Sequence, residues 1–157
     1  MYSVDTSALM DWQARFYPTD VFIGLKTQIE GLIASGKLRA PEIVKEELDA
    51  VGTPALKSWA KSQTGLFVPL EPQLQVETAT IQARYPELAD VKSGHESADP
   101  WVIALAELRG WMVVSQETSA AEKRKPPKSY YIPDVCRDLG VPCINLLGLM
   151  RKEGLTF

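Results

Sequence analysis

Short apolar runs alternate along this chain with longer segments in which apolar residues recur every three or four positions. The short runs predict strands at residues 2–5, 38–40, 66–68, 111–115 and 141–144. The longer segments predict helices at residues 20–35, 41–52, 54–59, 72–84, 99–109, 133–139 and 146–152. Strands that are separated by helices favour right-handed crossovers and a parallel sheet covered on both faces. We therefore predict an α/β fold, a three-layer α/β/α sandwich with a central parallel sheet, as a single domain over residues 1–157.

Two details of the pattern indicate where a functional site would lie. Residues 111–115 are nearly continuously apolar, which is typical of a strand buried on both faces. Asp99 precedes Pro100, and we expect it to be the N-cap of the helix that follows, with proline in the first turn. In open parallel sheets, ligands bind beyond the carboxyl ends of the strands. The residues that directly follow the strands are therefore the first candidates.

Composition narrows the class of protein without naming an activity. Hydrophobic residues make up 45% and charged residues 24% of 157 residues, which are ordinary values for a globular domain. No apolar stretch is long enough to span a membrane, and the N-terminus lacks the features of a signal peptide, so we expect a cytoplasmic protein. Cys136 and Cys143 form no CxxC pair, and we expect reduced thiols. The net charge of −3 argues against a surface coated in positive charge for nucleic acid.

Four acidic residues are expected near one edge of the sheet. Asp5 ends the first strand, Glu117 follows the central apolar strand, Asp99 begins a helix, and Glu47 lies in the helix after the second strand. Each has an ordinary alternative role, as an Asx turn, a helix cap or a solvated charge. Carboxylates that converge repel one another unless a cation is bound, and oxygen ligands alone favour Mg²⁺ or Mn²⁺. This interpretation requires Asp5 and Asp99 to lie within about a nanometre of each other.

Four segments carry a resemblance to a known family. They are residues 4–7 (Val-Asp-Thr-Ser), 44–48 (Val-Lys-Glu-Glu-Leu), 98–106 (Ala-Asp-Pro-Trp-Val-Ile-Ala-Leu-Ala) and 113–117 (Val-Val-Ser-Gln-Glu). In this order they resemble the PIN-domain (PilT N-terminus) nucleases, and most closely the VapC-like branch. The resemblance implies a Mg²⁺- or Mn²⁺-dependent endoribonuclease, usually the toxin of a type II toxin–antitoxin pair. It also implies an RNA substrate, a protein antitoxin as partner, and a homodimer.

The resemblance also implies roles for individual residues. The metal ligands that it implies are Asp5, Glu47 and Asp99, with Glu46 as an alternative to Glu47. Ser7 is the hydroxyl residue that would support Asp5. The family usually has Thr-x-Asp after the central strand, whereas this chain has Ser-Gln-Glu ending at Glu117. We expect Glu117 to complete the metal shell, directly or through water.

One segment is concentrated in positive charge. Its four basic residues, which are followed by Tyr130 and Tyr131, are Lys123, Arg124, Lys125 and Lys128. Prolines keep the segment extended, so its cations could neutralise RNA phosphates while a tyrosine stacks on a base. A solvated surface loop explains the same composition.

Other features leave alternatives open. His95, the only histidine, is read as an exposed residue, and Asp134 as a helix cap rather than a site residue. Trp12 and Phe16 belong to an aromatic group that fits either burial or an interface. A receiver-like phosphoacceptor domain has the same architecture but requires paired acids at the end of the first strand. Here Asp5 is followed by Thr6, which is not an acid. A catalytically impaired PIN-like module that binds RNA or protein remains the main alternative function.

Overall fold

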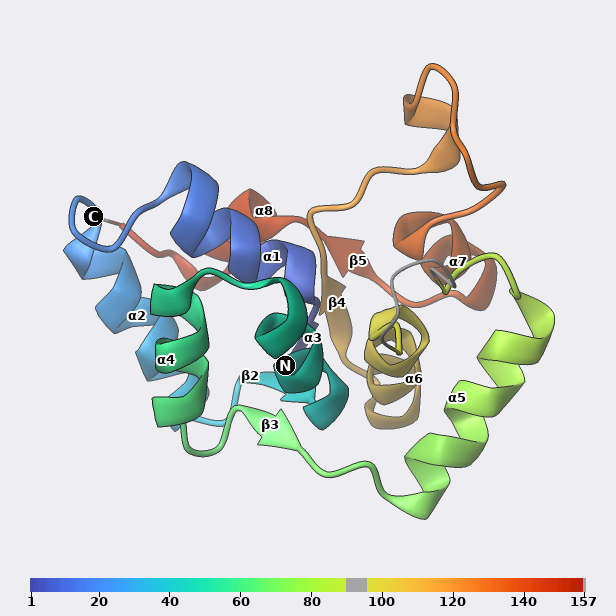
Figure 1. Ribbon diagram of the computed structural model, residues 1–157, viewed down its shortest axis with the longest axis horizontal. Coiled ribbons are helices and arrows are strands. Elements are labelled where there is room, and N and C mark those ends of the chain that lie inside the picture. Colours follow the sequence, from blue (N-terminus) through green and yellow to red (C-terminus); the bar gives the residue numbers. More distant parts are fainter. Residues whose placement is uncertain (90–95, 157) are drawn as a thin grey trace.

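A five-stranded, wholly parallel sheet forms the centre of the protein (Figure 1). The computed structural model describes residues 1–89 and 96–156. The strands lie in the order β3-β2-β1-β4-β5. Their bounds are β1 (Tyr2–Val4), β2 (Leu38–Pro41), β3 (Phe67–Val68), β4 (Met112–Val114) and β5 (Cys143–Ile144). Helices cover both faces of this sheet, which confirms the predicted three-layer α/β/α sandwich.

The predicted helices are all present, with ends displaced by a few residues. They are α2 (Ile23–Ala34), α3 (Glu42–Val51), α4 (Pro54–Ser62), α5 (Pro72–Arg84), α6 (Asp99–Arg109), α7 (Ile132–Leu139) and α8 (Leu146–Glu153). The structure adds α1 (Thr6–Met10), the π-helix η1 (Asp11–Phe16) and the 3₁₀-helix η2 (Ala120–Glu122), which the pattern did not predict. Within the described residues, no helix combines the length and the apolar character that crossing a membrane requires.

Strand β1 lies in the middle of the sheet, where the direction of the winding reverses. Its residue Ser3 pairs with Arg39 of β2 on one side and with Val113 of β4 on the other. The chain adds β2 and β3 on the first side and then crosses over to add β4 and β5 on the second. Such a reversal opens a crevice beyond the carboxyl ends of the two strands concerned. The residues that follow β1 and β4 therefore meet at this crevice.

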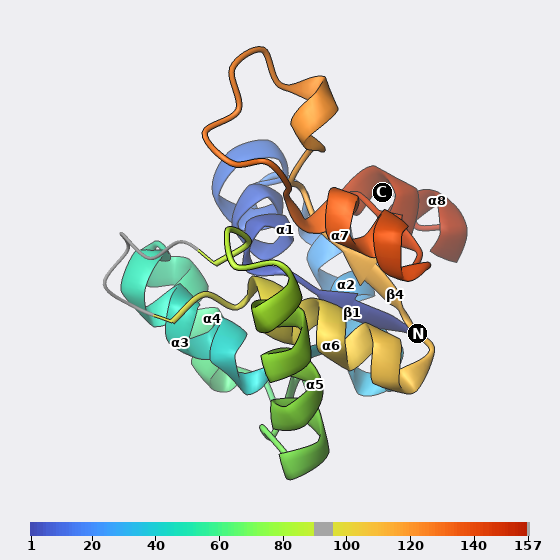
Figure 2. The ribbon, with the colours of Figure 1, turned by 90° about the vertical axis from the view of Figure 1, so that its right-hand side faces the viewer.

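Helix α6 is the most deeply buried helix next to the crevice. Seven consecutive residues, numbers 100–106, are buried, and the helix packs across β1, β2 and β4. Figures 1 and 2 show α5 covering the outer side of α6, with α2 on the opposite face of the sheet. Gly110 ends α6 in the left-handed conformation, with φ of 68°, which a glycine adopts without strain. This packing holds the first residue of α6 in a defined place at the crevice.

The start of α6 differs by one residue from the prediction. Ala98 is the N-cap, and Asp99 is the first helical residue instead of the cap. The backbone N–H of Ala98 donates to Oε2 of Glu47 at 2.9 Å, so a carboxylate from another helix satisfies one of the free amides of this helix end. The Asp99 side chain lines a pocket instead of capping its own helix.

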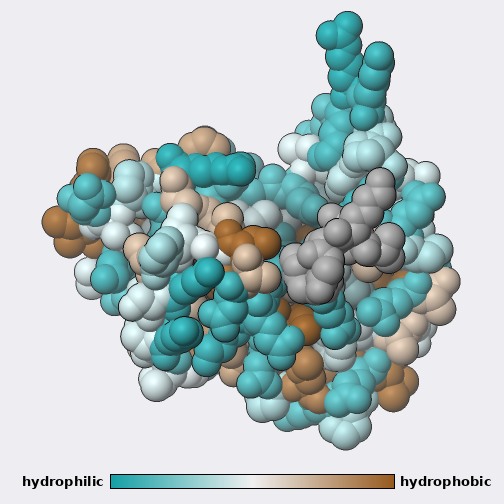
Figure 3. All heavy atoms as spheres, in the orientation of Figure 1, coloured by the Kyte–Doolittle hydropathy of each residue, from teal (hydrophilic) through white to brown (hydrophobic). Residues whose placement is uncertain are grey.

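The segment between β4 and α7 projects from the body of the protein. Figures 1 and 2 show it as a long arm that carries η2. The space-filling view shows hydrophilic side chains along its tip (Figure 3). The four residues of the predicted basic segment, Lys123, Arg124, Lys125 and Lys128, lie on this arm.

Candidate metal centre

Asp5 lies at the carboxyl end of β1, where its backbone N–H continues the ladder to Val114 O at 2.9 Å. One carboxylate oxygen, Oδ2, accepts hydrogen bonds from Ser7 Oγ (2.6 Å), Ser7 N (3.3 Å) and Ser115 Oγ (3.2 Å). The bond from Ser7 N to the side chain two residues before it is the Asx turn of the ordinary interpretation, and it makes Asp5 the N-cap of α1. Ser7 supports Asp5 as predicted, and Ser115 from β4 is a second support that sequence reasoning missed.

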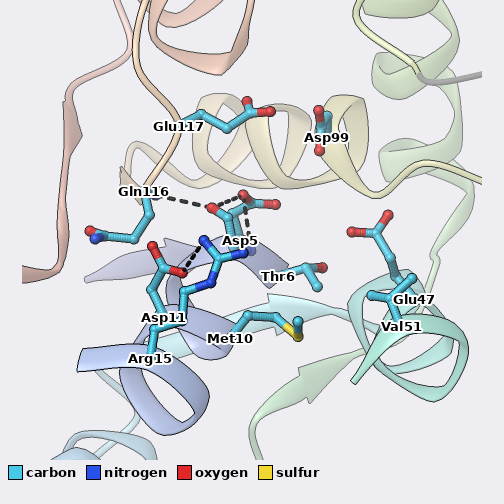
Figure 4. A pocket seen from close by; sticks show the side chains of 11 residues that line it. Asp5, Thr6, Met10, Asp11, Arg15, Glu47, Val51, Asp99, Gln116 and Glu117 are labelled. Atoms are coloured by element: carbon cyan, nitrogen blue, oxygen red, sulfur yellow. Dashed lines mark hydrogen bonds and ion pairs between the residues drawn. The ribbon is translucent and has the colours of Figure 1, made fainter. Parts of the chain in front are cut away.

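The other oxygen of Asp5 has a different environment. Asp5 is only 2% exposed, and no described residue donates a hydrogen bond to its Oδ1. Figure 4 shows this oxygen pointing into the space between Asp99 and Glu47. A buried carboxylate oxygen without a partner is costly, on the order of 1–3 kcal/mol or more. The capping role of Asp5 therefore accounts for one of its two oxygens, and a positively charged ligand could satisfy the second.

Glu47 and Asp99 complete a group of three carboxylates around that space. Ligand oxygens of Asp5, Glu47 and Asp99 all lie within 4.8 Å of one another. Asp5 is buried, whereas Glu47 and Asp99 are partly exposed. The expectation that Asp5 and Asp99 lie within a nanometre is confirmed. Glu46 is exposed to solvent on the same helix, so of the two adjacent glutamates it is Glu47 that enters the group.

Glu117 lies beside this group but outside it. Its side chain lines the same pocket (Figure 4), while its Oε2 accepts a hydrogen bond from Ile132 N, the first residue of α7, at 3.1 Å. Its own N–H donates to Ser115 Oγ at 3.1 Å. The free amides at the start of a helix favour a negative charge, so α7 holds the Glu117 carboxylate at the pocket wall.

Burial and mutual repulsion perturb three acids that line the pocket, Asp5, Asp99 and Glu117. Burial, with the nearby Glu117 carboxylate adding to it, raises the pKa of Asp5 to about 7. Burial and the charge of Asp5 raise the pKa of Asp99 well above its ordinary value, and burial raises the pKa of Glu117. Carboxylates with raised pKa values are unfavourable as anions in this arrangement. A bound cation would remove that cost, so the three grouped residues can hold a metal ion.

The pocket contains one residue type that the sequence did not suggest. The pocket has a volume of about 300 Å³. Among the described residues that line it, Arg15 alone carries a positive charge, and its Nη1 lies 3.2 Å from Asp11 Oδ1. The only available signal was spacing: Ser7, Asp11 and Arg15 follow one another at four-residue intervals, which places them on one side of a helix. Without a predicted helix in this segment, that spacing had no meaning.

The four predicted RNA-binding residues divide into two pairs. Lys123 lies over the Tyr131 ring, with its Nζ 4.2 Å from the centroid, and Lys128 Nζ donates to Leu88 O at 3.2 Å. The charges of these two lysines oppose the rise in the pKa of Glu117. Arg124 and Lys125 are exposed near the tip of the arm. The structure thus brings Lys123 and Lys128 toward the acidic pocket and leaves the other two in solvent.

Asp134 caps the start of α7 with its side chain, as predicted, although the N-cap position itself is Tyr131. Its Oδ2 accepts from Tyr131 N at 2.8 Å and from Ala120 N at 2.9 Å, which links the start of α7 to the arm. The pocket described above is not lined by Asp134. Its two hydrogen bonds hold together the elements that position Glu117 and the lysines.

The cysteines, the aromatic group and the histidine considered in the sequence differ in their surroundings. Cys136 and Cys143 are free thiols. The aromatic group divides, since Trp12 is fully buried while Phe16 is 56% exposed. His95 lies outside the described residues.

Comparison with known proteins shows the family of the chain but no activity. The family described as "Domain of unknown function (DUF4411)" matches residues 2–157. Searches of curated proteins and of solved structures returned no significant match.

Proposed function

The chain belongs to the DUF4411 family, and we propose that it is a Mg²⁺- or Mn²⁺-dependent nuclease that hydrolyses phosphodiester bonds in RNA. One observation carries the proposal. Three carboxylates from separate elements converge at the crevice of a parallel sheet, and the buried Oδ1 of Asp5 has no partner among the described residues. Acids that served only as caps or surface charges would not converge on an unpartnered buried oxygen.

The donor set supports a hard divalent ion. The grouped ligands are all carboxylate oxygens, which is the chemistry that Mg²⁺ and Mn²⁺ prefer. The span of 4.8 Å among these oxygens is close to twice the Mg–O distance of about 2.1 Å, so small side-chain movements suffice to bring all three to one ion. Asp5, Glu47 and Asp99 would hold the ion, in agreement with the roles that the resemblance implies.

The residues of the chain have separate tasks in such a site. Ser7 and Ser115 hold Asp5 through one oxygen and thereby leave the other free for the ion. The Ala98 amide orients Glu47. Bound there, the ion would supply positive charge that offsets the charge of a phosphodiester during attack by water. Glu117, which α7 holds at the pocket wall, completes the acidic shell and can accept a proton from water.

The choice of RNA and the biological role rest on other support. Lys123 and Lys128 beside the pocket and the exposed Arg124 and Lys125 on the arm offer contacts for a phosphate backbone. The resemblance to VapC-like PIN domains adds the role of toxin, a protein antitoxin and a homodimer to the proposal. These three points rest on the resemblance alone.

Metal binding and cleavage, measured together, test the proposal. Wild-type protein and Asp99→Asn are titrated with Mn²⁺ by electron paramagnetic resonance and then incubated with a labelled single-stranded RNA, with and without EDTA. Glu46→Gln is the matched control, because Glu46 is an exposed acid next to a proposed ligand. We expect Mn²⁺ binding and EDTA-sensitive cleavage in wild type and control, and loss of both in Asp99→Asn.

Two results would contradict the proposal in different ways. A wild-type protein that binds no Mn²⁺ refutes the metal site. A protein that binds Mn²⁺ and RNA but cleaves no RNA in any sequence context is instead a catalytically impaired binding module. The glutamate at position 117, which lies outside the group of three, is the feature that favours this second function.

A further inference from the structure

The cation of the pocket wall, Arg15, has no role in the proposed metal site. Its side chain is 68% exposed, whereas that of Asp11, its partner at 3.2 Å, is 13% exposed. The guanidinium therefore has donors that remain open to the solvent of the pocket. Arg15 belongs to the segment between β1 and α2, and Figure 4 shows it among the side chains that line the site.

The local backbone explains why Arg15 is directed to the pocket. Asp5 caps α1, and the chain continues into η1 without a break, so residues 6–16 form one helical segment. Trp12 anchors the segment, since it is fully buried and packs edge-on against Trp59 with ring centroids 4.9 Å apart. With that side buried, Ser7, Asp11 and Arg15 face the pocket. The widened turn of η1 is a rare feature that occurs frequently at functional sites.

The charge balance of the pocket leaves a task for this cation. Four acidic side chains of the cluster and its wall (Asp5, Glu47, Asp99 and Glu117), together with Asp11, line the pocket. A divalent ion offsets only two negative charges, so a phosphodiester that approaches the site meets residual repulsion. A guanidinium offers two parallel N–H donors that match the oxygens of a phosphate. We propose that Arg15 binds a backbone phosphate of the polynucleotide, and that Asp11 holds the guanidinium in place until the phosphate replaces it.

This inference rests on the proposed function, because it assigns a substrate contact to the same site. The alternative is that Arg15 and Asp11 form only a surface ion pair on a helix. Such pairs contribute little to stability. The two interpretations differ in one measurable property, which is the effect of Arg15 on nucleic-acid binding at an intact metal site.

The test compares three variants under metal-loaded conditions. Arg15→Gln removes the charge, Arg15→Lys keeps the charge but loses the two-pronged donor, and Arg109→Gln is the matched control. Arg109 is also an exposed arginine paired with a glutamate, at 3.7 Å from Glu71. It ends the helix that Asp99 begins, roughly 15 Å away along the axis. Mn²⁺ affinity, the KM for a labelled single-stranded RNA and the dependence of KM on KCl concentration are measured for each.

The expected results separate Arg15 from the metal site. Arg15→Gln should raise the KM roughly ten- to a hundredfold, as loss of a charged hydrogen bond does. It should also reduce the slope of log KM against log salt by about 0.7, the value of one phosphate contact on a single strand. Its Mn²⁺ affinity should stay near that of wild type. Arg15→Lys should keep the salt slope while it recovers only part of the affinity, and Arg109→Gln should resemble wild type.

The outcomes that overturn the inference differ from those that overturn the proposed function. If wild type binds Mn²⁺ and cleaves RNA while Arg15→Gln has an unchanged KM and salt slope, Arg15 is only a surface ion pair. If the Mn²⁺ affinity of Arg15→Gln falls in parallel with its RNA affinity, Arg15 maintains the fold of the site and binds no phosphate. A wild type that fails to bind Mn²⁺ overturns the proposed function and the inference together.

Discussion

Replacing Asp5 by asparagine should stabilise the metal-free protein and abolish its response to divalent ions. Asp5 is buried, and burial raises the pKa of its carboxyl to about 7. In the unfolded chain that pKa is near 3.8, so the carboxylate ionises readily only after unfolding. Above pH 7 the folded, metal-free protein therefore carries an unfavourable buried charge, which the asparagine variant lacks.

The magnitude follows from the difference between the two pKa values. Raising the pKa from 3.8 to about 7 corresponds to roughly 4 kcal/mol of lost stability at pH values above 7. Replacing the carboxylate by an amide removes this loss. Part of the gain in stability is offset in the variant, because the new amide group has to be hydrogen-bonded in the pocket. We expect Asp5→Asn to gain about 2–4 kcal/mol at pH 8, which is roughly 5–15 °C in Tm for a domain of this size.

The sign of the pH dependence is specific to a raised acid pKa. Below about pH 4 the Asp5 carboxyl is protonated in the folded and the unfolded protein, so its contribution to stability is fully retained. As the pH rises toward 7, the unfolded state loses its proton first and the wild-type protein is destabilised. Asp5→Asn should lack this component of the decline, and the two proteins should differ most at pH 8.

Thermal and urea denaturation between pH 4 and pH 8, in EDTA and in Mn²⁺, measure this effect. Mn²⁺ at a hundredfold excess over its Kd should stabilise wild type by about 2.7 kcal/mol and leave Asp5→Asn unchanged. Asp49→Asn, an exposed aspartate on α3, is the control and should follow wild type. The reasoning is refuted if Asp5→Asn is less stable than wild type at pH 8 in EDTA, or if Mn²⁺ stabilises both proteins equally.

Three further predictions concern single parts of the site. Glu47→Gln should weaken Mn²⁺ binding at least tenfold in calorimetry, whereas Glu46→Gln should not, and equal effects would mean that Glu47 is not a ligand. Glu117→Gln should slow RNA cleavage roughly 10- to 100-fold with a smaller loss of Mn²⁺ affinity; unchanged cleavage and affinity would remove Glu117 from the site. Neutralising Arg124 and Lys125 should reduce the salt dependence of RNA binding by about 0.7 per phosphate contact in fluorescence anisotropy, and a salt slope equal to that of wild type would show that the tip of the arm does not contact RNA.

Local sequence patterns were sufficient for most of the architecture. Apolar runs and helical spacing depend on neighbouring residues, so the strands and all but the first of the long helical segments could be recognised in order. Residues 6–16 were missed because Ala8, Leu9 and Trp12 form too short an apolar stripe, and the exposed Phe16 at its end obscures it. With that helix unrecognised, nothing in the sequence connected Arg15 to the site.

The general location of the acids could also be predicted from the sequence. Asp5 and Glu117 each follow a strand, and the carboxyl ends of parallel strands share one edge of the sheet. That rule brings such residues to the same region without any knowledge of strand order. It cannot say which side chains meet, because a helix presents each residue in a different direction.

The sequence by itself determined the parallel α/β sandwich and the set of acids that could take part in a site. Only the tertiary structure decided that Glu47 rather than Glu46 faces Asp5 and Asp99, that Glu117 stands beside these three, and that Arg15 joins the pocket. The reason is physical. Strand order and helix rotation are set by packing between residues far apart in the chain, and a shift of one helical position turns a side chain by about 100°.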